Sequence, residues 1–168
     1  CFFGCLLLKT ILFSDAMKIV LGEKAFESCN NIEKFNFEAT NEFHGMNYCF
    51  SKSTSFCSIL IQSEKITIGD FGFSGCSSLS AVSFYNANEL FFGEKVFEMC
   101  DKLNAFDVAS KDKFYAGQYC LSNLKSLFHV QIKGVIVTID NFCISGCNAL
   151  KTVSIKNAKN VFLKENAI

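Results

Sequence analysis

The stretch "FSGCSSLSAVSFYNANELFFGEKVFEMC", residues 73–100, decides the fold of this chain. Phe73 opens the stretch, Leu79 follows six positions later, and Val82 and Phe84 then alternate with small side chains. The same pattern begins again at Phe97. Self-similarity at a fixed period of 20 to 50 residues, roughly, is the signature of a repeat protein.

One template recurs along all 168 residues, and each copy is called a coil here. The opening positions, which are almost evenly spaced, are Phe2, Phe26, Phe50, Phe73, Phe97, Leu121, Ile144 and Ile168. The leucine column is Leu8, Ile32, Phe56, Leu79, Leu103, Leu127 and Leu150. The next column, three residues later, is Ile11, Phe35, Ile59, Val82, Phe106, Val130 and Val153. The column two residues after that is Phe13, Phe37, Ile61, Phe84, Val108, Ile132 and Ile155. A later column is Ile19, Phe43, Ile66, Leu90, Phe114, Val137 and Val161. No member is polar, so the columns indicate one continuous buried face.

A second order of repetition relates each coil to the third coil after it. "GEKAFESC" (22–29) corresponds to "GEKVFEMC" (93–100), and "YCFS" (48–51) corresponds to "YCLS" (119–122). We infer that a block of three coils was duplicated.

A coil of this length cannot bury its apolar face alone, so the coils must stack. The alternation around Val82 and Phe84 predicts a short strand in each coil, with the intervening residues pointing outward. The prediction is one repeat domain over residues 1–168, a solenoid of about seven coils with a parallel sheet of about seven short strands. For the return segments, such as "EKAFESC" (23–29), we expect a single helical or 3₁₀ turn or an extended edge.

The columns resemble the BspA-like leucine-rich repeat family. The residues that carry the resemblance are "IGDFGFSGCSSLSAVSF" (68–84) and "TIDNFCISGCNALKTVSI" (138–155). The resemblance implies a right-handed leucine-rich repeat solenoid, a β-rich member of the α/β class, with its parallel sheet on the concave side. It also implies a non-enzymatic binding or adhesion role at the cell surface. The proline that the family often carries after the strand is missing here, since the chain has none.

The composition argues against nucleic acid and membrane as partners, and the two ends of the sequence indicate a fragment. Sixteen lysines balance sixteen carboxylates and there is no arginine, so nucleic-acid binding is not expected. No apolar run approaches the roughly 18 residues of a membrane span, so we expect no membrane insertion within this segment. The chain begins at Cys1 and the repeat frame runs off both ends, so we expect a fragment of a longer array without caps.

Ten cysteines are present, and most fall in two columns. The first column holds Cys5, Cys29, Cys76, Cys100 and Cys147, and the second holds Cys1, Cys49, Cys120 and Cys143. Stacking at one-coil spacing allows disulfides, but buried reduced thiols are the favoured interpretation. No metal site and no cofactor are expected, because the CxxxC pairs lack nearby histidines.

Catalysis is not expected, and no catalytic residue is assigned. The two histidines, His44 and His129, lie four coils apart, so they cannot share a site. A Cys–His nucleophile would need contact between the two side chains. A hydrolase that uses Cys57, the one cysteine outside both columns, is the weakest of the three functional hypotheses.

The outward side of the predicted sheet is the candidate binding surface, because solenoids bind partners there. Its richest cluster combines one aromatic anchor with mixed polar groups, namely Tyr85, Asp107, His129, Gln131 and Lys133. The predicted function is a protein-binding or adhesion module that is secreted or on the cell surface. Its partner would be a protein, such as a host or matrix protein. The alternative is a cytoplasmic leucine-rich repeat scaffold or regulatory subunit with reduced cysteines.

Overall fold

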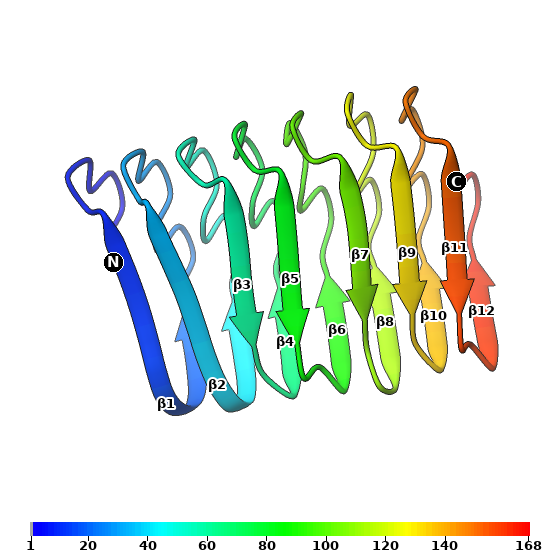
Figure 1. Cartoon of the computed structure of the whole chain (residues 1–168), viewed down its shortest axis with the longest axis horizontal. Helices are drawn as coiled ribbons and strands as arrows, with labels where there is room; N and C mark the ends of the chain where they lie inside the picture. Colours follow the sequence, from blue (N-terminus) through cyan, green and yellow to red (C-terminus); the bar gives the residue numbers. More distant parts are fainter. Residues whose placement is uncertain (1) are drawn as a thin grey trace.

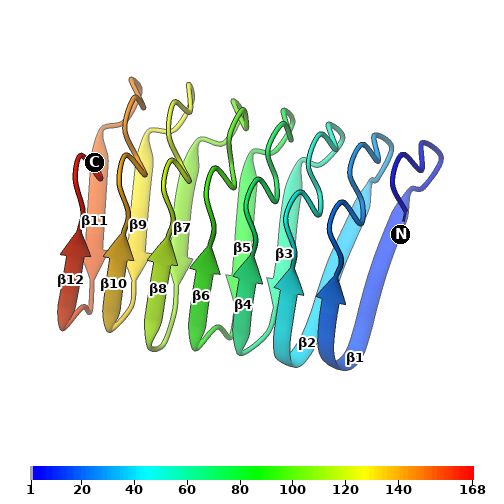
Figure 2. The same cartoon turned by 180° about the vertical axis from the view of Figure 1, so that it is seen from behind.

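The computed structural model describes residues 2–168 as a flattened solenoid built from two layers of strands (Figure 1). The two ends of the chain lie at opposite ends of its long axis, and Figure 2 presents the second layer from behind. Cys1, which belongs to the second predicted cysteine column, lies outside the described residues.

Each turn of the solenoid descends through a front strand, reverses, and ascends through a back strand. The front strands are β3 (Ser58–Gln62), β5 (Ala81–Tyr85), β7 (Ala105–Ala109), β9 (His129–Lys133) and β11 (Thr152–Lys156). The back strands are β4 (Lys65–Ile68), β6 (Glu89–Phe92), β8 (Lys113–Ala116), β10 (Ile136–Ile139) and β12 (Asn160–Leu163). In the first two turns, β1 (Thr10–Leu21) and β2 (Lys34–Gly45) bend through both layers without a break.

The pairing of the strands confirms the predicted columns. All described pairings are parallel, and they match equivalent positions of successive coils, such as Ile59 with Val82 and Val130 with Val153. Leu79 is fully buried, as are the column residues next to it. At the two ends the columns meet solvent, where Phe13 is 39% exposed and Val161 is 45% exposed. Stacking of one coil on the next therefore buries the core, as the repeat predicts.

Phenylalanine rings fill the opening column of the first five coils. Phe2, Phe26, Phe50, Phe73 and Phe97 stack with centroid distances of 5.0 to 5.7 Å and interplanar angles of 3 to 13°. Offset stacked rings attract one another beyond the burial of their area. The unusual content of 20 phenylalanines thus has a structural role in the core.

The return segments form successive β-turns, and no helix occurs within residues 2–168. The expectation of a helical or 3₁₀ turn, and with it the α/β class, is therefore wrong. In the segment after β1, Lys24 and Ser28 have φ angles of 57° and 61°. A helix needs negative φ throughout, so these two positions break it.

Hydrogen bonding explains why this conformation is preferred. The N–H groups of Ala25 and Glu27 donate to carbonyls three residues earlier, at Gly22 and Lys24, over 3.2 and 3.3 Å. The N–H group of Phe26 instead donates to a carbonyl of the next coil, at 2.8 Å. Alternate N–H groups thus close local turns and tie neighbouring coils together, which a helix could not do. Left-handed backbone at non-glycine residues costs roughly 1–2 kcal/mol each, and the bonds between coils offset this cost.

The front strands do not form the single seven-stranded sheet that the sequence predicts. Strands β7, β9 and β11 make one sheet, whereas β3 and β5 join β1, β2 and the back strands in a nine-stranded sheet. Among the described residues, no ladder of hydrogen bonds joins β5 to β7. In the core of these coils, the Phe92 ring packs 5.1 to 6.0 Å from four other phenylalanine rings.

A pair of substitutions in the leucine column tests the stacking. Leu79→Ala in the middle of the array should lower the free energy of unfolding by about 2–5 kcal/mol, because it opens a cavity in a closed core. Leu150→Ala is the matched control in the last full coil, where the same column residue is only partly buried, so its loss should be clearly smaller. Chemical denaturation followed by circular dichroism measures both. Equal losses would contradict the idea that neighbouring coils enclose the column.

Candidate functional site

The predicted binding residues lie together on the front layer, around the gap between β5 and β7. Tyr85 ends β5, Asp107 is on β7, and Gln131 and Lys133 are on β9. The strand register pairs Asp107 with Gln131, so their side chains share the outward face. Tyr85 is 53% exposed. The fold therefore brings residues from three successive coils to one place.

A hollow of about 410 Å³ opens at this gap, and we call it the front hollow. Phe84, Ala87 and Val108 are buried members of its lining and form its apolar floor. Seven exposed or half-exposed side chains form its polar rim, namely Ser83, Tyr85, Asn86, Asp107, Lys111, Gln131 and Lys133. An apolar floor with a polar rim is the usual anatomy of a protein-binding patch.

His129, the fifth predicted residue, stands beside the front hollow and not in its lining. Its Nε2 lies 3.2 Å from Oδ1 of Asp107, and its Nδ1 lies 2.5 Å from the hydroxyl oxygen of Thr152. The imidazole thus holds the Asp107 carboxylate at the rim. On the same face, Nζ of Lys156 donates a hydrogen bond of 2.6 Å to Oε1 of Gln131, which orients the amide.

Sequence reasoning missed the residues that the turns contribute. Lys111, Asn86 and Ala87 come after the strands, and the sequence assigned them only to polar turns. The backbone N–H of Lys111 donates to the carbonyl of Ala87 at 2.9 Å, which joins the two turns at the lower side of the hollow. The signal was available, because the turn after each strand must lie next to the last outward residue of that strand.

The back layer carries a ladder of alternating charge. Its members, one from each successive turn, are Lys18, Glu42, Lys65, Glu89 and Lys113. Glu89 lies 3.6 Å from Nζ of Lys65 and accepts a hydrogen bond of 3.0 Å from Lys113, which lowers the pKa of its carboxyl. These charges satisfy one another along the ladder.

A third surface runs along the return segments and was not foreseen. It stacks six side chains in the order Lys24, Tyr48, Phe71, Lys95, Tyr119 and Phe142. Tyr48 and Phe71 stack at 4.9 Å, and Nζ of Lys95 lies 5.5 and 5.6 Å from the Phe71 and Tyr119 rings. The order repeats after three coils. Because the ring faces cover one another, this ladder stabilises the turns and leaves mainly ring edges to solvent.

The thiols of the first cysteine column have a structural role. The Sγ atoms of Cys76 and Cys100 donate to the carbonyls of Phe50 and Phe73, each at 3.2 Å, and Cys147 repeats the contact with Leu121 at 3.0 Å. In the same column, the hydroxyl of Ser53 donates to the carbonyl of Phe26 at 2.7 Å. Cysteine and serine thus fill the same role in this column, whereas Leu124 occupies it in the sixth coil without a donor. The nine cysteines that the structure describes are all unpaired.

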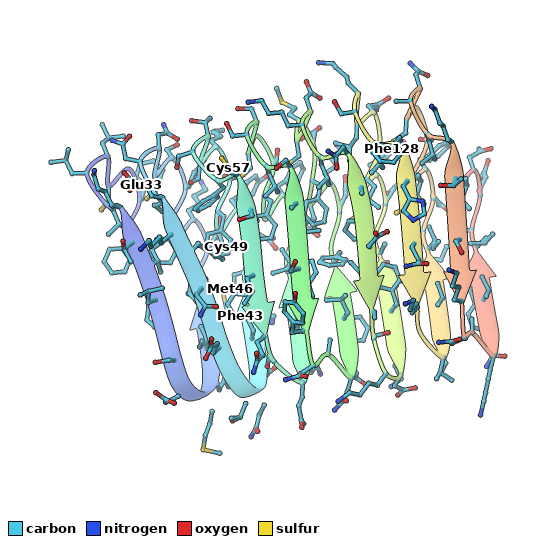
Figure 3. All side chains as sticks on the ribbon, in the orientation of Figure 1. Glu33, Phe43, Met46, Cys49, Cys57 and Phe128 are labelled. Atoms are coloured by element: carbon cyan, nitrogen blue, oxygen red, sulfur yellow. The ribbon has the colours of Figure 1, made fainter. Side chains whose placement is uncertain are left out.

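A cysteine nucleophile finds no support in this arrangement. Burial raises the pKa of the Cys49, Cys76 and Cys100 thiols, which disfavours the reactive thiolate. Cys57 is exposed, but it lies at the start of β3, whereas Phe128 marks the start of β9 beyond β5 and β7 (Figure 3). The neighbour of Phe128 in the sequence, His129, is therefore remote from Cys57.

Neither a metal-binding cluster nor a membrane-spanning helix is found among residues 2–168. No group of three or more histidine, cysteine, aspartate or glutamate side chains is arranged to hold a metal ion in this part of the chain. The same residues include no helix with the length and apolar character that a membrane crossing requires.

Comparisons with known proteins were made for sequence and structure. The sequence model of a family described as "BspA type Leucine rich repeat region" matches residues 1–104 and 46–167, with six copies. The crystal structure of a T. pallidum leucine-rich repeat protein is similar with a TM-score of 0.52 and 16% sequence identity. The similarity covers 92% of this chain and 76% of that one, and it supports the solenoid fold alone. No curated protein matches the sequence.

The buried thiols predict how stability depends on pH. In the unfolded chain they ionise near pH 9, whereas burial keeps Cys49 and Cys76 protonated in the fold. The free energy of unfolding should therefore fall as pH rises above 9, by about 1.4 kcal/mol per pH unit for each such thiol. The double variant Cys49→Ala/Cys76→Ala should show a shallower fall between about pH 9.5 and 10.5. Denaturant titrations at each pH measure it.

Cys57→Ala is the control for the substitution itself, since Cys57 is exposed and its removal opens no cavity in the core. Identical slopes for the double variant and the unaltered protein would contradict burial of the two thiols.

Proposed function

The chain belongs to the BspA-type leucine-rich repeat family, and from that premise we propose that residues 1–168 form one repeat domain that acts as a non-enzymatic protein-binding or adhesion module. Repeat solenoids of this kind present extended binding surfaces to their partners, and the stacked coils keep these surfaces rigid. A right-handed winding and a concave front surface, which the resemblance implies, are part of the proposal.

The front hollow is the observation that carries this proposal. It combines an apolar floor, an exposed aromatic side chain at Tyr85, and polar groups from three coils. Interfaces usually depend on a few such anchors, and aromatic residues are prominent among them. The back layer is less suited to this role, because its charged side chains are engaged with one another along the ladder.

We propose the cell surface or a secreted protein as the location of the module, as the family resemblance implies. An intracellular scaffold is the second candidate, and one observation favours it. The hydrogen bonds from Cys76, Cys100 and Cys147 to carbonyls of the preceding coil need reduced thiols, which reducing compartments maintain.

A photo-crosslinking amino acid at two positions tests the proposed function. Benzoylphenylalanine in place of Gln131 samples the front layer, and the same residue in place of Thr67 samples the back layer. Both positions are half-buried, outward-facing strand positions, so the two variants are matched. Irradiation with the proteins of the source cells, of their medium, and of host and matrix extracts should yield adducts mainly from the front position.

Excess unlabelled protein should abolish these adducts, because a specific surface saturates. Adducts in the cell-envelope or medium fraction favour the adhesion role, and adducts in the cytosolic fraction favour the scaffold. Equal labelling from front and back, or labelling that excess protein does not reduce, would contradict a partner-binding front layer.

A further inference from the structure

The floor of the front hollow exposes small parts of two column residues. Phe84 of β5 and Val108 of β7 are 8% and 4% exposed. At the same position of the neighbouring coils, Ile61 of β3 and Ile132 of β9 are 0% and 1% exposed. The missing ladder between β5 and β7 accounts for this difference. An apolar side chain of a partner can therefore contact column residues at the gap.

The rim of the hollow has cationic groups without acidic partners. Within residues 2–168, neither Lys111 nor Lys133 has a carboxylate oxygen within ion-pair distance, although both line the hollow. The lining holds these two lysines and one carboxylate, that of Asp107. A ligand that brings carboxylates to this rim would gain favourable electrostatic interactions.

Asp107 requires that the ligand also carry a hydrogen-bond donor. Its carboxylate lines the same hollow and remains 54% exposed beside His129. A backbone N–H group of a peptide can donate to it, whereas a densely sulfated polysaccharide would leave the apolar floor without a partner.

We propose that the front hollow binds an acidic segment of a partner protein, which inserts one apolar side chain between β5 and β7. In this complex, carboxylates of the segment pair with Lys111 and Lys133, and its backbone donates to Asp107. The inference rests on the proposed function and names the chemistry of the partner. It concerns one surface, so it can fail while the module still binds a partner elsewhere on its front layer.

A set of fluorescein-labelled peptides tests the proposal by fluorescence anisotropy with the intact 168-residue chain. The probe is Gly-Asp-Glu-Phe-Glu-Asp-Gly, and its controls carry glycine in place of phenylalanine or lysine in place of the four acids. The probe should bind at least about tenfold more tightly than either control, because each control removes one of the two features of the hollow. A heparin hexasaccharide tests the sulfated glycan and should bind more weakly than the probe.

Matched protein variants locate the binding. The double variant Lys111→Glu/Lys133→Glu should weaken binding of the probe by about tenfold or more, whereas Lys102→Glu reverses an exposed lysine outside the hollow and should have little effect. Ala109→Trp fills the hollow from an exposed position and should abolish binding. Ala81→Trp, at an exposed position of β5 outside the lining, should not. Circular dichroism verifies that each variant is folded.

Three results would overturn the proposal. They are no binding of the probe at millimolar protein, equal binding to the glycine-substituted peptide, and tighter binding of the heparin hexasaccharide. If one of them occurs while the Gln131 photo-crosslink still forms, the acidic-segment chemistry is wrong and the binding module stands. If the crosslink also fails, the proposed function itself is wrong.

Discussion

The register between coils is the constraint on which the rest of this structure depends. Backbone hydrogen bonds join each turn to the next through the strands and through alternate N–H groups of the return segments, such as that of Phe26. Register places equivalent side chains directly above one another. Every column, whether of phenylalanine rings, thiols or alternating charges, is a consequence of this one condition. A coil has little structure of its own, because its turns and strands find their partners in its neighbours.

The sequence predicted the columns well, because burial must repeat wherever the backbone repeats. Leu79 and its equivalents stack as expected, and the cysteine column is interior. The return segments were predicted wrongly, since spacing tells which residues face inward but not which carbonyl each N–H group will find. The backbone is left-handed at Lys24 and Ser28, and a lysine or a serine in the sequence does not indicate this conformation. The same limit explains why an expected helical turn became a succession of β-turns.

The candidate site was accessible to prediction in part. Tyr85, Asp107, Gln131 and Lys133 are outward residues of neighbouring coils, so the period alone groups them. The hollow between them could not be predicted, because it lies where the ladder between β5 and β7 is missing, and the columns continue through these coils without a change. Lys111 was overlooked although it could have been predicted, since it lies in the turn next to the last outward residue of β7. Sequence periodicity thus does not predict where a repeat becomes irregular, although a binding surface can form at such a place.

The ladder of Lys24, Tyr48, Phe71, Lys95, Tyr119 and Phe142 has a genetic consequence. The order of the ladder returns after three coils. Unequal recombination between the two blocks would therefore delete or add three whole coils. Each aromatic or cationic side chain at the new junction would then stack on a residue of the same type as before. Recombination at any other offset would set unlike residues against one another along this edge. Array length can therefore vary readily in steps of three coils, while the cross-section stays constant.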